Sequence, residues 1–234
     1  MNIAIILAGG YGTRISGKIP KQLIKIADKP ILIHTIEIFL LNDKIKHIII
    51  VCNKKIISEV NDLIKFYWSD NNKKIDVIEG GETRNHSILM AYNFLNENYN
   101  LNNKDIIITH DAVRMFVNKK LINDSIKSCM TNHIIIPTID IVDSICKIDE
   151  NNITMINRNT IKIIQTPQTL HYETFKLMFE KKINLLMNPD WDLCWLSNIN
   201  KVNILNIKGL NQNIKITTDF DLFFAKNIYQ ENQK

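Results

Sequence analysis

The first side chains able to do chemistry lie in a glycine-rich segment that directly follows the apolar run Ile3–Leu7. This segment is Ala8-Gly9-Gly10-Tyr11-Gly12-Thr13-Arg14, and Lys21 follows seven residues after Arg14. Glycines let backbone N–H groups approach a phosphate without a Cβ in the way. Arg14 offers a two-pronged donor to phosphate oxygens, and Lys21 a compact positive charge. This spacing predicts that a diphosphate or triphosphate binds at the carboxyl end of the first strand.

Two common phosphate-binding motifs do not fit this segment. A Walker A loop closes with Gly-Lys-Ser or Gly-Lys-Thr, whereas Gly12 is followed by Thr13-Arg14. A dinucleotide fingerprint needs a third small residue, and Ile15 occupies its position. The alternative is a glycine-rich turn whose arginine does not bind a phosphate.

A second group of polar residues surrounds a glycine pair, in Gly80-Gly81-Glu82-Thr83-Arg84-Asn85-His86-Ser87. A strand is expected to end at the glycine pair and a helix to begin shortly after it. Backbone amides and the Ser87 hydroxyl can then face a base or a ribose. A plain strand–helix turn with an exposed Ser87 is the alternative.

The third group is His110-Asp111-Ala112-Val113-Arg114, at the end of another buried strand. Open α/β sheets bind ligands at the carboxyl ends of their strands. Asp111 is suited to hold Mg²⁺ against triphosphate oxygens, since that ion prefers oxygen ligands. Arg114 can receive the phosphate of a second substrate. His110 is interpreted as structural, because a phosphate nucleophile is already an anion and needs no general base.

Buried strands and helical segments alternate along most of the chain. This alternation predicts an α/β fold with a doubly wound, mostly parallel sheet. The expected strands are Ile3–Leu7, Ile48–Cys52, Ile75–Glu79, Asp105–Thr109, Ile134–Pro137 and Val202–Ile207, and the expected helices span about 30–41, 57–67, 87–96, 175–187 and 219–229.

Residues 138–165 break this pattern, because short β-rich stretches alternate there with turn residues such as Asp149-Glu150-Asn151-Asn152. We expect a β-arm that leaves the main sheet. Residues 1–234 are otherwise interpreted as a single domain carrying this arm.

Composition is that of an ordinary globular protein, with 45% hydrophobic residues, 23% charged residues and a net charge of +5. The positive residues form no block, so we expect no nucleic-acid partner. The apolar runs are too short for a signal peptide or a membrane span. Four widely separated cysteines (Cys52, Cys129, Cys146 and Cys194) fit reduced thiols, and we expect a cytoplasmic protein.

Three later motifs complete a pattern: Arg158-Asn159, Gln165-Thr166-Pro167-Gln168 and Asn213-Ile214-Lys215-Ile216-Thr217-Thr218. Taken in order with the motifs above and with Pro20-Lys21-Gln22, they resemble the IspD-type cytidylyltransferases. That family includes 2-C-methyl-D-erythritol 4-phosphate cytidylyltransferase and ribitol-5-phosphate cytidylyltransferase. The resemblance implies transfer of a cytidylyl group from CTP to a polyol phosphate with Mg²⁺, in preference to transfer from ATP, GTP or UTP. It also implies a Rossmann-like fold whose β-arm forms a homodimer.

The resemblance also implies roles for individual residues. Arg14 and Lys21 correspond to the pair that stabilises charge on the triphosphate, and Lys215 to the lysine that faces the α-phosphate. Arm residues of the family reach the neighbouring subunit's site. The implied nucleotide-binding residues are Leu7, Ala8, Gly9, Gly10, Gly12, Thr13, Gly81, Glu82 and Ser87, and the implied acceptor-binding residues are Asp111, Arg114, Ser144, Arg158 and Thr166.

The acceptor is left open because the segments that depart from the family pattern border its site. Met115 replaces a usual proline, Gln212 replaces an often acidic residue, and Trp191–Cys194 keeps only Asp192 of its motif. Ribitol 5-phosphate is the first choice, and 2-C-methyl-D-erythritol 4-phosphate of isoprenoid biosynthesis is the alternative. Another polyol or sugar-like phosphate of capsule or teichoic-acid synthesis is a third option, and a nucleotide-binding pseudoenzyme a fourth.

Overall fold

The structure is a computed structural model that describes residues 1–10, 19–69, 74–131, 133–150, 152–180, 193 and 202–233. Three predicted site residues, Gly12, Thr13 and Arg14, lie outside this part of the chain, as do Asp192 and Cys194.

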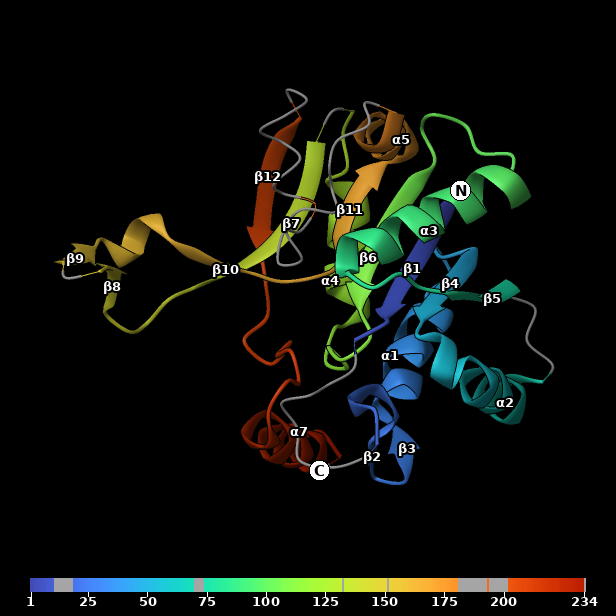
Figure 1. Cartoon of the computed structure of the whole chain (residues 1–234), viewed down its shortest axis with the longest axis horizontal. Coiled ribbons are helices and arrows are strands. Elements are labelled where there is room, and N and C mark those ends of the chain that lie inside the picture. Colours follow the sequence, from blue (N-terminus) through green and yellow to red (C-terminus); the bar gives the residue numbers. More distant parts are fainter. Residues whose placement is uncertain are drawn as a thin grey trace.

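A central sheet runs through the body of the protein (Figure 1). Its eight strands in the described part of the chain have the order β10-β7-β11-β6-β1-β4-β5, with β12 paired to β7. Strand β1 pairs in parallel with β4 and β6, β4 with β5, and β7 with β12, whereas β11 runs antiparallel to both β6 and β7. The strands are β1 (Asn2–Ala8), β4 (His47–Cys52), β5 (Lys74–Glu79), β6 (Ile106–Asp111), β7 (His133–Asp140), β10 (Lys162–Ile164), β11 (Gln168–His171) and β12 (Asn203–Lys208).

Helices pack on both faces of the sheet, because apolar side chains of a central strand alternate between two cores. Ala4 and Ile6 of β1 join the core that contains residues of α1, α2 and α4. Ile3 and Ile5 join the core that contains residues of α3 and α5. A strand buried on both faces is therefore continuously apolar. The helices are α1 (Ile31–Leu40), α2 (Ile57–Trp68), α3 (Arg84–Asn98), α4 (Lys119–Lys127), α5 (Tyr172–Glu180) and α7 (Asp219–Glu231).

A smaller third core lies beside the carboxyl end of β6. There Ala225 of α7 packs with Val113, Met115 and Ile216. Two short strands, β2 (Lys25–Ile26) and β3 (Lys29–Pro30), pair in this region, and Ile26 belongs to the same core. Short 3-10 helices occur at Lys21–Leu23 (η1), Lys54–Ile56 (η2) and Arg158–Thr160 (η3).

The predicted α/β class and mostly parallel sheet are confirmed. Helix α4 and the antiparallel strand β11 were not expected from the sequence, and neither were the short elements η1, η2, β2 and β3. The helix expected over about 175–187 is described as α5, which begins at Tyr172 and is described to Glu180. The remainder of that expected helix lies outside the described residues.

The β-arm projects from the body of the protein (Figure 1). Its two strands, β8 (Ile145–Asp149) and β9 (Asn152–Ile156), pair with each other in antiparallel register. The predicted arm bounds of 138–165 were too wide, because β10 pairs with residues 138–140 of β7 as part of the main sheet. The projecting segment consists of residues 141–150 and 152–161.

Three cysteines are described, and each has a free thiol: Cys52, Cys129 and Cys146. Within the described ranges, no helix combines the length and the apolar character needed to cross a bilayer. The cytoplasmic location expected from the cysteines stays a prediction.

Candidate functional site

A cavity of about 230 Å³ lies where the carboxyl ends of β1 and β6 meet the first turn of α3. It brings together ten of the seventeen predicted site residues. The predicted site residues that line it are Leu7, Ala8, Gly9, Gly10, Lys21, Gly81, Glu82, Ser87, Asp111 and Lys215. Five residues that were not predicted also line it, namely Gln22, Thr83, Arg84, Ala112 and Val113.

The wall beside β1 is held by Gln22. Its side chain is buried, and its Nε2 donates to the carbonyl oxygen of Ala8 at 2.8 Å. This bond ties the turn η1 to the end of β1. A Cβ on Gly10 would lie 3.7 Å from Cε of Lys21, so the Lys21 side chain lies close to the glycine backbone. Gln22 belongs to the Pro20-Lys21-Gln22 motif, so its position in that motif could have identified it as a site residue from the sequence.

The opposite wall is a turn closed by Thr83 and Ser87. The Thr83 hydroxyl caps α3 by accepting the backbone N–H of His86 at 3.1 Å. The Ser87 hydroxyl accepts the N–H of Gly81 at 3.1 Å and donates to the carbonyl oxygen of Thr83 at 3.0 Å. A Cβ on Gly81 would lie 2.1 Å from Cγ of His86, so this close approach requires glycine. Ser87 therefore shapes the turn, and its contact with a nucleoside stays a prediction.

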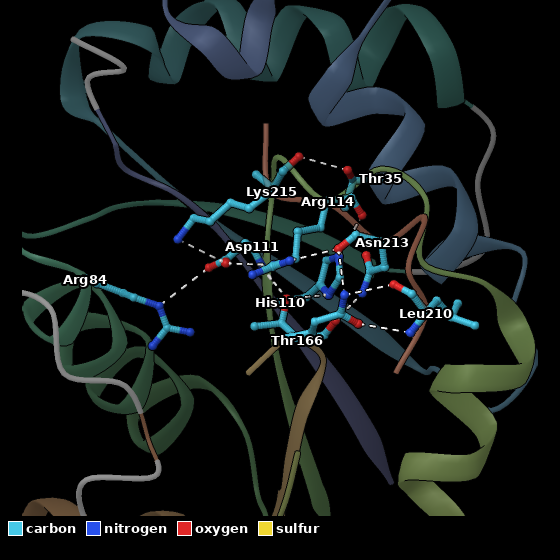
Figure 2. A network of polar contacts seen from close by, with 11 residues as sticks. Thr35, Arg84, His110, Asp111, Arg114, Thr166, Leu210, Asn213 and Lys215 are labelled. Carbon is cyan, nitrogen blue, oxygen red and sulfur yellow. Dashed lines mark hydrogen bonds and ion pairs between the residues drawn. The ribbon is translucent and has the colours of Figure 1, made fainter. Parts of the chain in front are cut away.

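Asp111 lies among three positively charged side chains (Figure 2). Its Oδ1 is 3.5 Å from Nε of Arg84. Its Oδ2 is 3.3 Å from Nε of Arg114 and 3.2 Å from Nζ of Lys215. Burial by itself would raise the pKa of this carboxyl, but the positive charges of Arg84, Lys215 and Arg114 outweigh it and hold the pKa well below its usual range. The ionised carboxylate leaves an excess of positive charge beside the cavity, which suits an anionic ligand.

His110 and Thr166 form a buried pair behind Asp111. Nε2–H of His110 donates to the carbonyl oxygen of Arg114 at 3.1 Å, so Nδ1 accepts from the Thr166 hydroxyl at 3.0 Å. The same hydroxyl accepts the backbone N–H of Asp111 at 3.2 Å. Burial lowers the pKa of His110 to about 4. The imidazole is therefore neutral near pH 7 and acts as a structural group, in agreement with the interpretation from sequence.

The segment that carries Lys215 is fixed by its neighbours. Asn213 donates from Nδ2 to the carbonyl oxygen of Thr166 at 2.8 Å, and its own carbonyl accepts from Nη1 of Arg114 at 2.8 Å. The N–H of Ile216 donates to the carbonyl oxygen of Val113 at 3.0 Å. Gln165 adds a bond from Nε2 to the carbonyl oxygen of Leu210 at 2.8 Å. The motifs around Thr166 and Asn213 thus hold Lys215 against the end of β6.

Four predicted acceptor residues do not line the cavity. Arg114 and Thr166 are buried beside Asp111. Ser144 and Arg158 are exposed on the arm, where Nη1 of Arg158 donates to the carbonyl oxygen of Val142. Their contacts with an acceptor stay predictions.

The described residues do not form a protein-built metal site. They contain no cluster of three or more histidine, cysteine, aspartate or glutamate side chains suited to hold an ion. Asp111 is an unfavourable ligand for a divalent cation, because three positive side chains already surround its carboxylate. The assignment of Asp111 to a metal stays a prediction that this geometry does not favour.

Arg84 is the most informative cavity residue that was not predicted. It stands three residues after Gly81, in the same motif as Ser87, but nothing in the linear motif says that its side chain meets Asp111. The contact between Arg84 of α3 and Asp111 of β6 can be recognised only when the relative positions of these two elements are known.

Comparison with known proteins gives the family. The family model of IspD, 2-C-methyl-D-erythritol 4-phosphate cytidylyltransferase, matches residues 2–231. A ribitol-5-phosphate cytidylyltransferase of Lactiplantibacillus plantarum is 34% identical over 238 aligned residues, which cover 99% of each chain. A 2-C-methyl-D-erythritol 4-phosphate cytidylyltransferase of Thermosipho africanus is 38% identical over 224 residues, or 95% of each chain.

A solved structure shares the fold. The 4-diphosphocytidyl-2C-methyl-D-erythritol synthase of Anaerococcus prevotii superposes with a TM-score of 0.77 at 24% identity, over 98% of this chain and 96% of that one. The match of the family model over almost the whole sequence and the two relatives at 34% and 38% identity show that the chain belongs to the IspD family of cytidylyltransferases, which are nucleotidyltransferases.

Proposed function

We propose that this protein transfers the cytidylyl group of CTP to a polyol phosphate and releases pyrophosphate. The observation that carries the proposal is the single cavity that joins the glycine-rich end of β1, Lys21, and the positive side chains Arg84 and Lys215 around Asp111. A site of this kind suits two phosphate-bearing substrates, because the positive side chains of Lys21, Arg84 and Lys215 all line it.

The chemical step needs positioning more than proton transfer. A phosphate oxygen of the acceptor attacks the α-phosphorus of CTP and forms the new P–O bond. The bond from the α-phosphorus to the bridging oxygen breaks, and pyrophosphate leaves with that electron pair. The attacking oxygen is already anionic near pH 7, so neutral, buried His110 is not needed as a base. The protein's contribution is then alignment and stabilisation of negative charge.

Three side chains supply that positive charge in this proposal. Lys21 binds the triphosphate together with Arg14, which lies outside the described residues. Lys215 approaches the α-phosphate from the side of β6, where Asp111 holds its amino group. Cations placed where charge develops in the transition state act most strongly when water is excluded from the site.

We infer that Mg²⁺ reaches the site bound to the triphosphate oxygens of CTP. Bound in that way, the ion neutralises part of the triphosphate charge. Asp111 then organises Arg84, Arg114 and Lys215.

Choice of CTP over UTP is assigned to Glu82. This residue is exposed in the cavity wall beside Gly81. A carboxylate accepts hydrogen bonds from an exocyclic amine, which cytosine has and uracil lacks. UTP is expected to bind less well, because uracil carries a carbonyl oxygen in place of that amine. This oxygen cannot donate a hydrogen bond to the Glu82 carboxylate.

Ribitol 5-phosphate is the proposed acceptor. The support is the relative of that name, which matches this chain over 99% of both lengths. The second candidate is 2-C-methyl-D-erythritol 4-phosphate, which is favoured by the description of the family model and by the relative that is 38% identical.

We also propose a homodimer formed through the arm. Four apolar side chains of the projecting segment, Val142, Ile148, Ile153 and Met155, are between 67% and 80% exposed. An isolated two-stranded hairpin is marginally stable in water, and a concentration of exposed apolar side chains is typical of an interface. A second subunit would cover this surface and bring Arg158 and Ser144 to its neighbour's site.

A matrix of pyrophosphate-release assays tests the proposal. CTP, UTP, ATP and GTP are each combined with ribitol 5-phosphate, 2-C-methyl-D-erythritol 4-phosphate or no acceptor, in the presence of Mg²⁺. We expect release with CTP and a polyol phosphate together, fastest with ribitol 5-phosphate. Equal turnover with UTP would contradict the cytidylyl assignment, and faster turnover with the methylerythritol substrate would replace the proposed acceptor. A Glu82→Gln variant is expected to narrow the preference for CTP over UTP.

A further inference from the structure

Arg84 has a buried hydrogen-bond donor with no acceptor. Its Nε faces Oδ1 of Asp111 at 3.5 Å, and its side chain lines the cavity (Figure 2). Its Nη1 is fully buried and finds no hydrogen-bond partner. Among the described residues, this is the one buried donor of a permanently charged side chain that lacks an acceptor.

Leaving such a donor unsatisfied is costly. A buried polar group without a partner costs about 1–3 kcal/mol, and a charged one costs more. Asp111 offsets part of the cost through Nε, but it also faces Arg114 and Lys215, so one carboxylate is shared by three positive charges. The guanidinium of Arg84 is therefore incompletely paired within the protein. Because the side chain lines the cavity and is 19% exposed, an anionic ligand there would complete its pairing.

The position of Arg84 selects which ligand supplies that oxygen. Arg84 and Lys215 contact the two oxygens of the same carboxylate, so both positive charges lie next to Asp111 at the cavity. In the proposed reaction, Lys215 faces the α-phosphate, and the attacking phosphate must lie within about 3.5 Å of the phosphorus. A phosphate held beside Asp111 would meet both cations.

We propose that Arg84 binds the phosphate group of the acceptor through its guanidinium and aligns the phosphate oxygen for attack on CTP. This inference rests on the proposed function, and it adds a binding residue for the acceptor from the same chain that binds the nucleotide. It also gives Asp111 a second role, since the carboxylate orients Arg84 through Nε and leaves the remainder of the guanidinium for the substrate.

The test is a steady-state comparison of wild type with Arg84→Gln and Arg84→Lys, together with calorimetric titration of each protein with CTP. Arg84→Gln is expected to raise the acceptor KM by about 10- to 100-fold, the range for losing a hydrogen bond to a charged group. The Kd for CTP is expected to stay within about threefold of wild type, because Lys21, Lys215 and Glu82, to which the nucleotide is assigned, are unchanged. Arg84→Lys keeps the positive charge, so its acceptor KM is expected to lie between those of wild type and Arg84→Gln.

Lys120→Gln is the matched control, because it removes one positive charge from a side chain that is 82% exposed on α4. It is expected to behave as wild type, and circular dichroism must show that all variants are folded. An unchanged acceptor KM, a loss of kcat alone, or an equal loss of CTP affinity would each overturn the proposal. These three outcomes can be observed only if the wild-type protein is active. A wild-type protein that is inactive with every polyol phosphate would instead refute the proposed function itself.

Discussion

At the scale of single residues, Asp111 is the centre around which the charges of the site are arranged. It anchors Lys215, which was predicted, and Arg84, which was not. Motif spacing identified Asp111 and Lys215 because each belongs to a recognisable segment. The pairing with Arg84 was not accessible in this way, since it depends on how α3 and β6 are placed.

Substitution of either lysine to which a catalytic role is assigned, Lys21 or Lys215, tests the proposed charge stabilisation. Lys21→Ala and Lys215→Ala are each expected to lower kcat by about 10²–10³, by analogy with the loss of one donor that stabilises a transition-state oxyanion. Lys215 is 41% exposed at its side chain, so its removal should leave the fold intact. Pyrophosphate release gives kcat, and unchanged circular dichroism is the condition for a valid test. A variant with near wild-type kcat would remove that lysine from the catalytic set.

The buried His110 predicts a specific pH dependence of stability. Its pKa is about 4 in the folded protein and about 6.5 in an unfolded chain. Below pH 6.5 the unfolded chain therefore binds a proton that the folded protein does not, and stability falls as the pH decreases towards 4. By pH 5.5 this group is expected to remove about 1.4 kcal/mol from the free energy of unfolding.

Urea unfolding of wild type and His110→Gln at pH 7.5 and pH 5.5 measures this effect, since all other titrating groups are shared. An NMR titration of the imidazole provides an independent value of the pKa in the folded wild type. Identical pH dependence in both proteins, or an imidazole that titrates near pH 6.5, would show that His110 is not buried in neutral form.

At the scale of elements, the first turn of α3 matters both for stability and for the shape of the site. Thr83→Ala removes the cap that accepts the N–H of His86 and is expected to cost about 0.5–2 kcal/mol of unfolding free energy. Because Thr83 also lines the cavity, the KM for CTP is expected to rise by about two- to tenfold.

Asn118→Ala provides the matched comparison, because Asn118 caps α4 by accepting the N–H of Leu121 at 2.8 Å. It is expected to cost a similar amount of stability without changing the KM for CTP. Chemical denaturation and steady-state kinetics measure the two effects separately. Equal kinetic changes in the two variants would mean that lowered stability, and not the shape of the turn, affects nucleotide binding.

The strands were more accessible from the sequence than two of the smaller elements. Continuous apolar runs such as Ile48–Cys52 are typical of strands buried on both faces, and the structure contains a strand there. Strand β11 is only four residues long and includes Gln168 and His171, so it shows no apolar run. Helix α4 buries only Leu121, Ile122 and Ser125, a face too short to stand out, although Asn118 was a usable capping signal.

At the scale of the whole molecule, the function of the projecting arm cannot be explained from a single subunit. Its β-rich character was evident from turn residues between short strands, but its bounds were not. Residues 138–140 and 162–164 have the same β-rich composition as the projecting hairpin, yet they pair with each other at the edge of the main sheet. Composition alone does not distinguish paired edge strands from a projecting hairpin.

Mixing two inactive variants tests whether the arm completes a neighbour's site. Arg158→Ala and Lys215→Ala proteins are each expected to be inactive alone. After subunit exchange, activity is expected to return to at most about a quarter of wild type, because about half of the dimers are mixed and each carries one complete site. Light scattering should give the mass of a dimer. Demonstrated exchange without recovery of activity would place Arg158 in its own subunit's site or outside catalysis.

The central claim, attack of an acceptor phosphate on the α-phosphorus of CTP, is tested most directly by following oxygen atoms. The protein is incubated with CTP, Mg²⁺ and ribitol 5-phosphate whose phosphate carries ¹⁸O, and the products are analysed by mass spectrometry. The account predicts that all the label stays in a cytidine diphosphate conjugate of the polyol and that the pyrophosphate is unlabelled. Label in the pyrophosphate, or hydrolysis of CTP without formation of a conjugate, would contradict it.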